Sequence, residues 1–527
     1  MRLLGIAGLL AATITLSCTA SRRPTPLAEP RATLVVVITV DQLRADYVTR
    51  YGQQFTGGLA RVLRGGAWYV NGFQDHANTE TAPGHATILS GRFPRNTGIV
   101  SNDRGVPDTA TRLLGSAGPG ASPHRFRGAT LLDWVRAREP EARALSVSRK
   151  DRGAILPLGR AREAVYWYAP EGRFTTSTYY ADTLPTWVQA FNARRIPESM
   201  AGRAWSLLLP ESAYAEPDSQ PIEAGGRGFL FPHTVSADTS RAARTLYNYP
   251  WMDEILLEFT LTGITALDLG RSASTDIVAI SLSTTDAIGH RYGPDSREIH
   301  DQMLRLDRAL GTFIDSLYRL RDSAGIVMAL TADHGVAPFP ELYAARSGRP
   351  AGHVDLRELV AATRQGLAAH GLGQEAFRLE GDALWVDRGA FTAAGVSADS
   401  VVTAFADAAR NVPGVLRVDP VRALAHADMT SDALARRWYH AIPPDLPIEL
   451  VVTLQPHFVW GHSSEAQHGG PHDYDTRVPI VFYGPAFLPG RHSEPALVVD
   501  IAPTLAAALG VVPEGPVDGR VLTSSMR

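Results

Sequence analysis

The chain has 527 residues, of which 45% are hydrophobic and 20% charged, and this composition is that of an ordinary globular protein. The length is enough for one large α/β domain with insertions, or for two to three domains of average size. The formal net charge is −3 and the sequence has no long basic run, so binding to a nucleic-acid polymer is not expected.

The first 18 residues have the pattern of a secretory signal peptide. Arg2 precedes an apolar run, Leu3 to Leu16, which is too short and wrongly flanked for a permanent membrane span. Cys18, the only cysteine, ends this segment as in a bacterial lipoprotein signal, so a lipid anchor through Cys18 and plain cleavage both remain open. Residues 19–31 are expected to form a flexible tether, and the mature protein is expected in the periplasm or at the cell surface.

Short apolar, β-branched runs predict five buried strands. Runs of this length suit strands that are covered by helices on both faces. Apolar residues at helical spacing predict helices over 297–320 and 500–510, the second with Gly510 as its C-cap. The alternation predicts a doubly wound α/β fold, with a mostly parallel central sheet and helices on both faces. The predicted strands are LVVVITV (34–40), ALSVS (144–148), IVAISL (277–282), IVMALT (326–331) and VPIVFYG (478–484).

Two stretches interrupt the alternation within the expected main domain, 32–527. Residues 155–245 are aromatic and rich in turn residues, and residues 350–455 form a second segment of mixed αβ pattern. Both are interpreted as cap insertions on the core.

Carboxylate and imidazole side chains follow three of the predicted strands and precede a fourth. Ligands bind at the carboxyl ends of the strands in open α/β sheets, and mixtures of imidazole and carboxylate ligands suit zinc. A single histidine of this kind is more often structural. Because such residues recur at several strand ends, they favour a centre with two zinc ions. The candidate ligands are Asp41, Asp286, His290, Asp333, His334 and His468.

The segment TETAPGHATILSG contains a candidate nucleophile, Thr81. Pro83 suits the first turn of a helix, which places Thr81 at a helix N-terminus, where backbone amides favour an anion. A hydroxyl needs a metal ion to become nucleophilic at neutral pH, so Thr81 is expected also to be a metal ligand. Without the candidate ligands elsewhere in the chain, Thr81 would be interpreted only as an N-cap.

Three further polar residues are candidates for binding substrate. Lys150 and Arg152 follow the strand at 144–148 in SVSRKDRGAILP, and ammonium and guanidinium groups suit phosphate oxygens. Basic residues are normally solvated surface, but these two are bounded by a buried strand and an apolar run. Asn102, in GIVSNDRG, can donate an amide hydrogen bond to an oxyanion.

The motifs TETAPGHATILSG, TDAIGHRYG, TADHG and HGGPHDYDTRVPIVFYGP resemble the alkaline phosphatase superfamily, in order along nearly the whole mature chain. The sequence is most similar to the branch of secreted bacterial alkaline phosphatases with a threonine nucleophile, the PafA-like branch. Nucleotide pyrophosphatases/phosphodiesterases are related to it. The resemblance implies one zinc site of Asp286, His290 and His468, and a second of Asp41, Asp333 and His334 with Thr81 bridging toward substrate. It also implies that Asn102, Lys150 and Arg152 hold the phosphate oxygens.

The function that the resemblance implies is hydrolysis of small phosphate monoesters through a phosphothreonine intermediate, with release of inorganic phosphate. A phosphodiesterase or nucleotide pyrophosphatase on the same scaffold is the alternative, and the lysine–arginine pair favours a dianionic monoester. Thr81 argues against a sulfatase and the signal peptide against a phosphoglycerate mutase, while a non-catalytic binding lipoprotein is disfavoured because every site residue is present. No obligate protein partner is predicted.

Overall fold

The computed structural model describes residues 32–527. The predicted signal peptide (1–18), the tether (19–31) and Cys18 lie outside the described residues. Among the helices of the described part, none is long and apolar enough to cross a bilayer.

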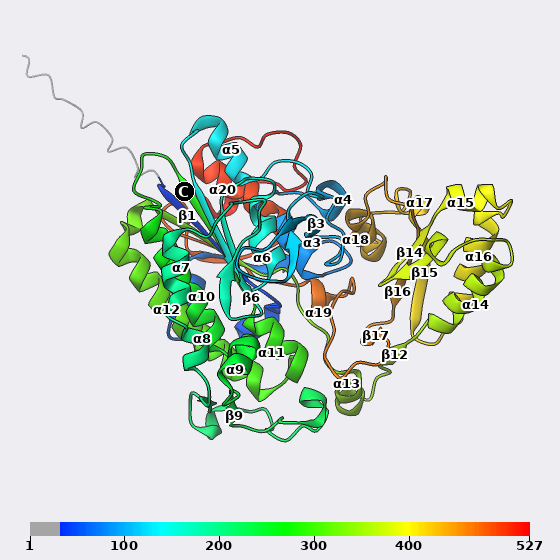
Figure 1. The fold of residues 1–527 in the computed structure, drawn as a ribbon, viewed down its shortest axis with the longest axis horizontal. Helices are drawn as coiled ribbons and strands as arrows, with labels where there is room; N and C mark the ends of the chain where they lie inside the picture. Colours follow the sequence, from blue (N-terminus) through cyan, green and yellow to red (C-terminus); the bar gives the residue numbers. More distant parts are fainter. Residues whose placement is uncertain (1–31) are drawn as a thin grey trace, which may run out of the picture.

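A nine-stranded sheet runs through the centre of the larger lobe, in the order β19-β2-β18-β11-β1-β10-β5-β6-β7 (Figure 1). The strands β11, β1, β10 and β5 are parallel neighbours, as the sequence predicts. All four are buried along their full length, because helices cover both faces of the sheet. Their bounds are β1 (Leu34–Val40), β5 (Ala144–Ser148), β10 (Asp276–Leu282) and β11 (Ile326–Thr331).

The strands beyond β11 form a mixed edge of the sheet, with both antiparallel and parallel pairs. The predicted fifth strand forms β18 (Ile480–Tyr483), which runs antiparallel to both β11 and β2 (Ala67–Phe73). The outermost strand, β19 (Gly490–Leu497), pairs in parallel with β2. A run of buried apolar residues does not reveal strand direction, so the sequence left this mixed edge undetermined.

Helices lie on both sides of the sheet, which confirms the doubly wound arrangement. On one side α10 (Trp251–Ala266) packs on α12 (Arg297–Leu320), which also contacts α2 (Gly58–Gly65). On the other, α5 (Leu131–Arg138) packs on α20 (Ile501–Leu509) (Figure 1). The predicted helix at 297–320 is confirmed, and Gly510 caps α20 with φ 67°, a left-handed conformation that glycine adopts without strain.

Part of the first predicted insertion belongs to the core. β6 (Ala164–Ala169) pairs in parallel with β5, and β7 (Arg173–Thr175) continues the sheet to its other edge. Interpreting all of 155–245 as a cap was therefore wrong for these strands, because aromatic residues such as Trp167 and Phe174 are buried in the main core. The rest of the segment contains short helices and the two-stranded pair β8 (Ala204–Trp205) and β9 (His233–Thr234).

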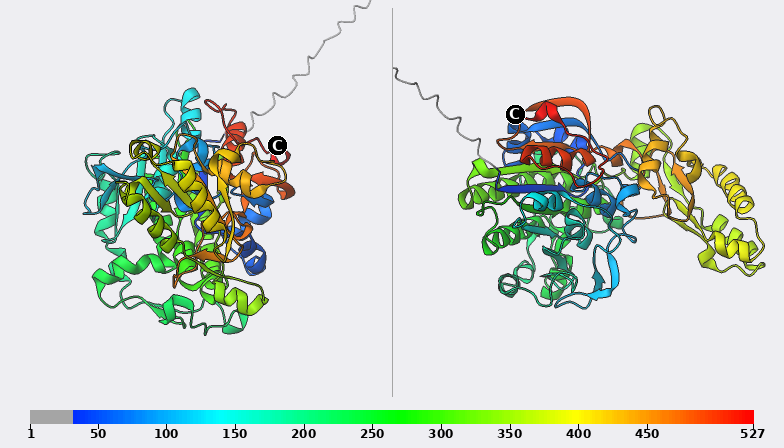
Figure 2. Two further views of the ribbon diagram at one scale, coloured as in Figure 1. Left: turned by 90° about the vertical axis from the view of Figure 1, so that its right-hand side faces the viewer. Right: turned by 90° about the horizontal axis from the view of Figure 1, so that it is seen from above.

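The second insertion forms a smaller lobe that projects from one side of the core (Figures 1 and 2). Its four-stranded sheet has the order β13-β14-β16-β15, and its own apolar core includes Phe377, Phe391 and Phe405. Helices α14 (Arg357–Ala368) and α16 (Ala398–Arg410) pack on each other. The strands are β13 (Phe377–Glu380), β14 (Ala383–Val386), β15 (Val415–Pro420) and β16 (Ile448–Leu454).

Candidate active site

Three parallel strands end side by side and deliver the acidic residues of the site. In the register of the sheet, Val40 at the end of β1 lies opposite Leu282 at the end of β10, and Thr39 lies opposite Thr331 at the end of β11. Asp41 follows β1 directly, and Asp333 follows β11 by two residues. Because the strands stop at the same level, residues far apart in the sequence meet at one edge of the sheet.

One group of side chains gathers around Asp286. Asp286 and His290 lie one turn apart on α11 (Thr284–Tyr292), with His290 Nε2 3.2 Å from Asp286 Oδ1. His468 comes from the loop before β18, and its Nε2 lies 3.8 Å from the same oxygen. The ligand atoms of these three residues lie within 4.8 Å of one another, which is close enough to hold one metal ion.

A second group adjoins the first. His334 Nε2 lies 3.5 Å from Asp41 Oδ1 and 3.6 Å from Asp333 Oδ2. Ligand atoms of Asp41, Asp286 and His334 also lie within 4.8 Å of one another. Asp286 is therefore common to both groups, whereas the sequence assigned it to one only. The two rings of His334 and His468 stack at 3.7 Å between centroids and connect the groups.

The three candidate histidine ligands are all oriented by the backbone. The Nδ1 atoms of His290, His334 and His468 bond to the carbonyl oxygens of Ala466, Gly335 and Thr79, at 2.6, 2.9 and 2.8 Å. These bonds place the proton on Nδ1 and leave the Nε2 lone pair directed into the site. Burial, together with the neighbouring His334 and His290, holds the pKa of His468 well below its usual range, so this imidazole stays neutral.

Three carboxylates share this buried space. Burial, and then the charges of Asp286 and Asp333, raise the pKa of Asp41. Burial alone would also raise the pKa of Asp286, but Lys150 and His290 outweigh it and lower that pKa well below its usual range. Within residues 32–527, Asp41 Oδ1 and His334 Nε2 are buried without a hydrogen-bond partner. Unpaired buried acceptors of these types fit a divalent cation, and the residues present therefore suit a metal centre.

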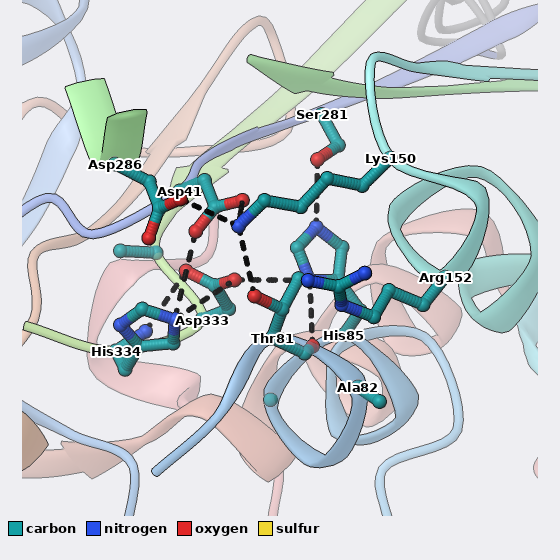
Figure 3. Close-up of polar contacts among 12 residues, drawn as sticks. Asp41, Thr81, Ala82, His85, Lys150, Arg152, Ser281, Asp286, Asp333 and His334 are labelled. Atoms are coloured by element: carbon teal, nitrogen blue, oxygen red, sulfur yellow. Dashed lines mark hydrogen bonds and ion pairs between the residues drawn. The ribbon is translucent and has the colours of Figure 1, made fainter. Parts of the chain in front are cut away.

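Thr81 is the first residue of α3 (Thr81–Ile88), as the sequence predicts, and every residue of this helix is buried. Its Oγ1 accepts a hydrogen bond from Lys150 Nζ at 3.0 Å (Figure 3). The same ammonium lies 2.7 Å from Asp41 Oδ2 and 2.7 Å from Asp286 Oδ2. Lys150, expected at the phosphate oxygens, thus contacts the candidate nucleophile and the carboxylates of Asp41 and Asp286.

The helix that carries Thr81 approaches Asp333 closely. A Cβ atom on Gly84 would lie only 2.4 Å from the carbonyl oxygen of Asp333, so glycine is required at this contact. His85, on the same helix, bonds through Nδ1 to the carbonyl of Thr81 at 2.9 Å, and the Nδ1 also lies 3.1 Å from Asp333 Oδ2. Its Nε2 lies 2.8 Å from Ser281 Oγ of β10. His85 therefore links the start of α3 to two strand ends.

Asn102 and Arg152 flank the start of α3. Asn102 Oδ1 accepts a hydrogen bond from the Ala82 amide at 2.9 Å, which leaves the Nδ2 group as a donor. The backbone N–H of Asn102 donates to Glu80 Oε2 at 2.6 Å. Arg152 extends from α6 (Asp151–Ile155) toward Thr81 (Figure 3), and its Nε is buried without a hydrogen-bond partner in the described part of the chain.

The sequence reasoning missed one residue and one signal. Gln42, with φ 67°, donates from Nε2 to Asp286 Oδ1 at 3.1 Å and from its backbone amide to Asp333 Oδ1 at 3.1 Å. Its position next to Asp41 was the only hint of this role. The missed signal concerns Lys150, which is the only lysine in a chain with 51 lysine and arginine residues. Every other member of this set is an arginine, so the ammonium group of lysine occurs at this one buried position alone.

Comparison with known proteins identifies related chains. The family model described as type I phosphodiesterase / nucleotide pyrophosphatase matches residues 35–475. Alkaline phosphatase PhoV of Synechococcus elongatus is 30% identical over 96% of this chain and 94% of its own, and alkaline phosphatase PhoK of Sphingomonas sp is 31% identical over 93% and 90%. The crystal structure of wild-type alkaline phosphatase PafA superimposes with a TM-score of 0.87 at 26% identity, covering 94% of this chain and 99% of that one.

Proposed function

The chain belongs to the type I phosphodiesterase/nucleotide pyrophosphatase family, and we propose that within this family it is an alkaline phosphatase. The proposed reaction is the hydrolysis of small phosphate monoesters with release of inorganic phosphate. Relatives that carry this name match it over nearly their full length. The observation that carries the proposal is the contact of the Lys150 ammonium with Thr81 Oγ1 at 3.0 Å. A cation in that position faces both the attacking oxygen and the phosphoryl group that it attacks.

Two zinc ions are proposed as cofactors, with Asp286, His290 and His468 holding one, and Asp41, Asp333, His334 and Thr81 holding the other. The imidazole and carboxylate donors described above support this assignment, and the Asp286 carboxylate is placed to contribute to the second ion as well, because its ligand atoms lie within 4.8 Å of those of Asp41 and His334. When bound, such ions supply Lewis acidity to the attacking and leaving oxygens and offset the negative charge of the phosphoryl group.

Thr81 is proposed as the nucleophile. Its Oγ1 releases its proton to solvent and bonds to phosphorus as the bond from phosphorus to the ester oxygen breaks, and the departing alkoxide takes a proton from solvent. Water then attacks the phosphothreonine, inorganic phosphate leaves, and the hydroxyl of Thr81 is restored. The ammonium of Lys150 favours the deprotonated form of Oγ1 during attack, because an adjacent positive charge stabilises an anion.

Arg152 and Asn102 are proposed to bind the non-bridging oxygens. The unpaired Nε of Arg152 and the Nδ2 of Asn102 are donors beside the start of α3. A guanidinium binds phosphate through parallel hydrogen bonds. The fixed cations Lys150 and Arg152 favour a dianionic monoester over a monoanionic diester, because each extra negative charge on the substrate adds an attraction.

A direct test compares p-nitrophenyl phosphate with methyl p-nitrophenyl phosphate. We expect wild type to prefer the monoester, and Thr81→Ala to reduce monoester turnover by about 10³-fold or more. Thr392→Ala, an exposed threonine of the smaller lobe, is the matched control and should leave turnover unchanged. A preference for the diester that Lys150→Ala does not alter would instead identify a phosphodiesterase. A chain that purifies without zinc and has no chelator-sensitive turnover would support a binding role.

Export to the periplasm or cell surface is also proposed, and it is supported by the sequence of residues 1–18. Labelling cells with a radioactive fatty acid separates the two possible fates of Cys18. Incorporation that disappears in Cys18→Ala indicates a lipid anchor, and a mature chain without label indicates plain cleavage.

A further inference from the structure

A cleft of about 420 Å³ opens beside Asp286 and His290. Three arginines line it, Arg149, Arg227 and Arg291, and they come from three separate segments of the chain. The acidic residues among its lining are Asp286 and Glu465. Asp286 lies 2.7 Å from the Lys150 ammonium, so the negative charge of its carboxylate is largely balanced within the reaction centre. The outer part of the cleft is therefore positively charged.

Arg149 forms the inner wall. It follows β5 directly and precedes Lys150, and its guanidinium lies over the ring of Tyr247, 5.0 Å from the centroid. One terminal nitrogen lies 3.7 Å from Asp286 Oδ2, which is too long for a hydrogen bond. Within residues 32–527 its Nε is buried without a hydrogen-bond partner. A buried guanidinium with an unsatisfied donor in a cleft is suited to an anionic ligand.

Arg227 and Arg291 form the outer wall. Arg291 follows His290 on α11, and its Nε is also buried and unpaired among the described residues. Arg227 is exposed on the loop after residues 223–226. In the described part of the chain, neither guanidinium has a carboxylate within 4.0 Å, although most other arginines of this protein form ion pairs or hydrogen bonds. The Arg291 guanidinium lies 5.4 Å from the centroid of the Tyr292 ring, but neither positive charge is neutralised by a carboxylate.

The cleft adjoins the reaction centre through Asp286, which lines it. Lys150 Nζ contacts both Thr81 Oγ1 and Asp286, and Asp286 borders the cleft. In an in-line displacement the leaving oxygen departs opposite the attacking oxygen. A leaving group that extends past Asp286 and His290, away from Thr81, would therefore enter the cleft with the three arginines.

We propose that this cleft binds a leaving group that itself carries a phosphate, so that the favoured substrates are bisphosphorylated small molecules. One phosphate reacts at Thr81 while the other is bound by Arg149, Arg227 and Arg291. This inference rests on the proposed phosphatase activity and adds the class of leaving group. Bidentate guanidinium–phosphate contacts account for the choice of phosphate over a neutral alcohol.

The test compares propane-1,3-diol monophosphate with propane-1,3-diol bisphosphate, whose reacting esters are alike. After division by two for the two equivalent esters, kcat/KM for the bisphosphate is expected to exceed that for the monophosphate by about 10-fold or more at low salt. Most of the difference should lie in KM, and it should shrink as ionic strength rises. Arg227→Gln and Arg291→Gln are each expected to lower the ratio of the two kcat/KM values by about 3-fold or more.

Charge-retaining and distant variants serve as controls. Arg227→Lys should keep most of the preference, and Arg410→Gln, an exposed arginine of the smaller lobe, should leave both substrates unaffected. Equal kcat/KM values for the two substrates would overturn the inference, and so would a preference for the bisphosphate that persists in the double variant Arg227→Gln/Arg291→Gln. In either case, hydrolysis of the monophosphate by wild type would still support the proposed function. If wild type hydrolyses neither monoester, the proposed function itself fails.

Discussion

The ammonium of Lys150 lies 3.0 Å from Thr81 Oγ1, and 2.7 Å from a carboxylate oxygen of Asp41 and of Asp286. One cation therefore contacts the candidate nucleophile and two candidate metal-binding carboxylates. Only 8% of its side chain is exposed, and two ion pairs compensate its burial. An ammonium in this position is placed to stabilise a negative charge on Thr81 Oγ1.

Replacing Lys150 tests this role. Lys150→Ala is expected to lower kcat/KM for a phosphate monoester by about 10²- to 10³-fold, because a fixed charge beside the reacting oxygen is lost. The loss for a diester should be smaller, since a diester carries less charge. Steady-state kinetics with both substrates measures the difference, and equal losses would contradict a role in selecting the dianion.

Because Lys150 is the only lysine in the sequence, chemical labelling provides an independent check that it lies in the phosphate-binding site. An amine-selective reagent can label only Lys150 and the chain N-terminus, so a mass spectrum assigns the label without ambiguity. Inorganic phosphate should slow labelling of Lys150 and leave that of the N-terminus unchanged. If inorganic phosphate did not change the rate at which Lys150 is labelled, the ammonium would lie outside the phosphate-binding site.

His85 is predicted to position Thr81 without contacting substrate. Its two ring nitrogens bond to the Thr81 carbonyl and Ser281 Oγ in a fully buried site, so His85→Ala leaves polar groups unpaired. We expect a loss of about 1–3 kcal/mol in the free energy of unfolding and a fall in kcat with little change in KM. Urea unfolding and kinetics measure both, with Ser281→Ala as a milder variant of the same contact. Wild-type stability in His85→Ala would argue against this role.

Arg104 connects the loop of Asn102 to the smaller lobe. Its guanidinium lies 3.8 Å from the ring centroid of Trp385 and donates from Nε to Glu380 Oε2 at 3.2 Å. Arg104→Ala is expected to raise KM for a monoester by about 3- to 10-fold, because the loop that presents Asn102 loses its anchor. Arg104→Lys should be less affected, and Arg410→Gln unaffected. A change confined to stability, with KM unaltered, would show that the contact only joins the two lobes.

Asp75 is predicted to make the stability of the contact between the core and the smaller lobe depend on pH. Arg436, on α18 (Ala433–Ala441) of the smaller lobe, donates to both of its carboxylate oxygens, at 2.8 and 3.0 Å. Burial raises the pKa of Asp75, but hydrogen bonds from His440 and Arg436 outweigh burial and lower the pKa from 3.8 to about 2. A lowered pKa stabilises the fold above the unfolded value, near pH 4, and this contribution is lost as the pH falls toward 2.

Asp75→Asn should therefore lower the free energy of unfolding by about 2 kcal/mol at pH 7. The difference from wild type should become smaller between pH 4 and pH 2. Urea unfolding at several pH values measures it. Asp407→Asn, which removes an exposed ion pair with Arg410, is the control and should have little effect. A deficit that stays constant with pH would rule out the carboxylate charge as its cause.

Asp286 is predicted to be required for both metal ions, since its carboxylate belongs to both groups of ligand atoms. Asp286→Ala should retain less zinc per chain than His290→Ala, in which only one group is altered. Metal analysis of the purified variants decides this, with Asp428→Ala, an exposed carboxylate, as control. A chelator should abolish monoester turnover and added zinc should restore it. Equal zinc content in Asp286→Ala and His290→Ala would mean that the groups do not share this residue.

The sequence alone determined the features that depend on local pattern. Buried strands at 34–40, 144–148 and 326–331 and the helix at 297–320 follow from apolar periodicity, which reports how a segment faces the core. The start of α3 at Thr81 and its motif residues were equally readable. These motifs sufficed to predict which polar residues gather at the strand ends.

Only the tertiary structure decided relationships between segments. The antiparallel direction of β18, the place of β6 in the sheet, the sharing of Asp286 and the position of Lys150 between two carboxylates all depend on side chains that are distant in the sequence. The orientation of the imidazoles likewise depends on carbonyl groups of other loops, such as Thr79 for His468. Periodicity records burial but not the identity of the neighbour, and these contacts become defined only when the folded chain brings the neighbours together.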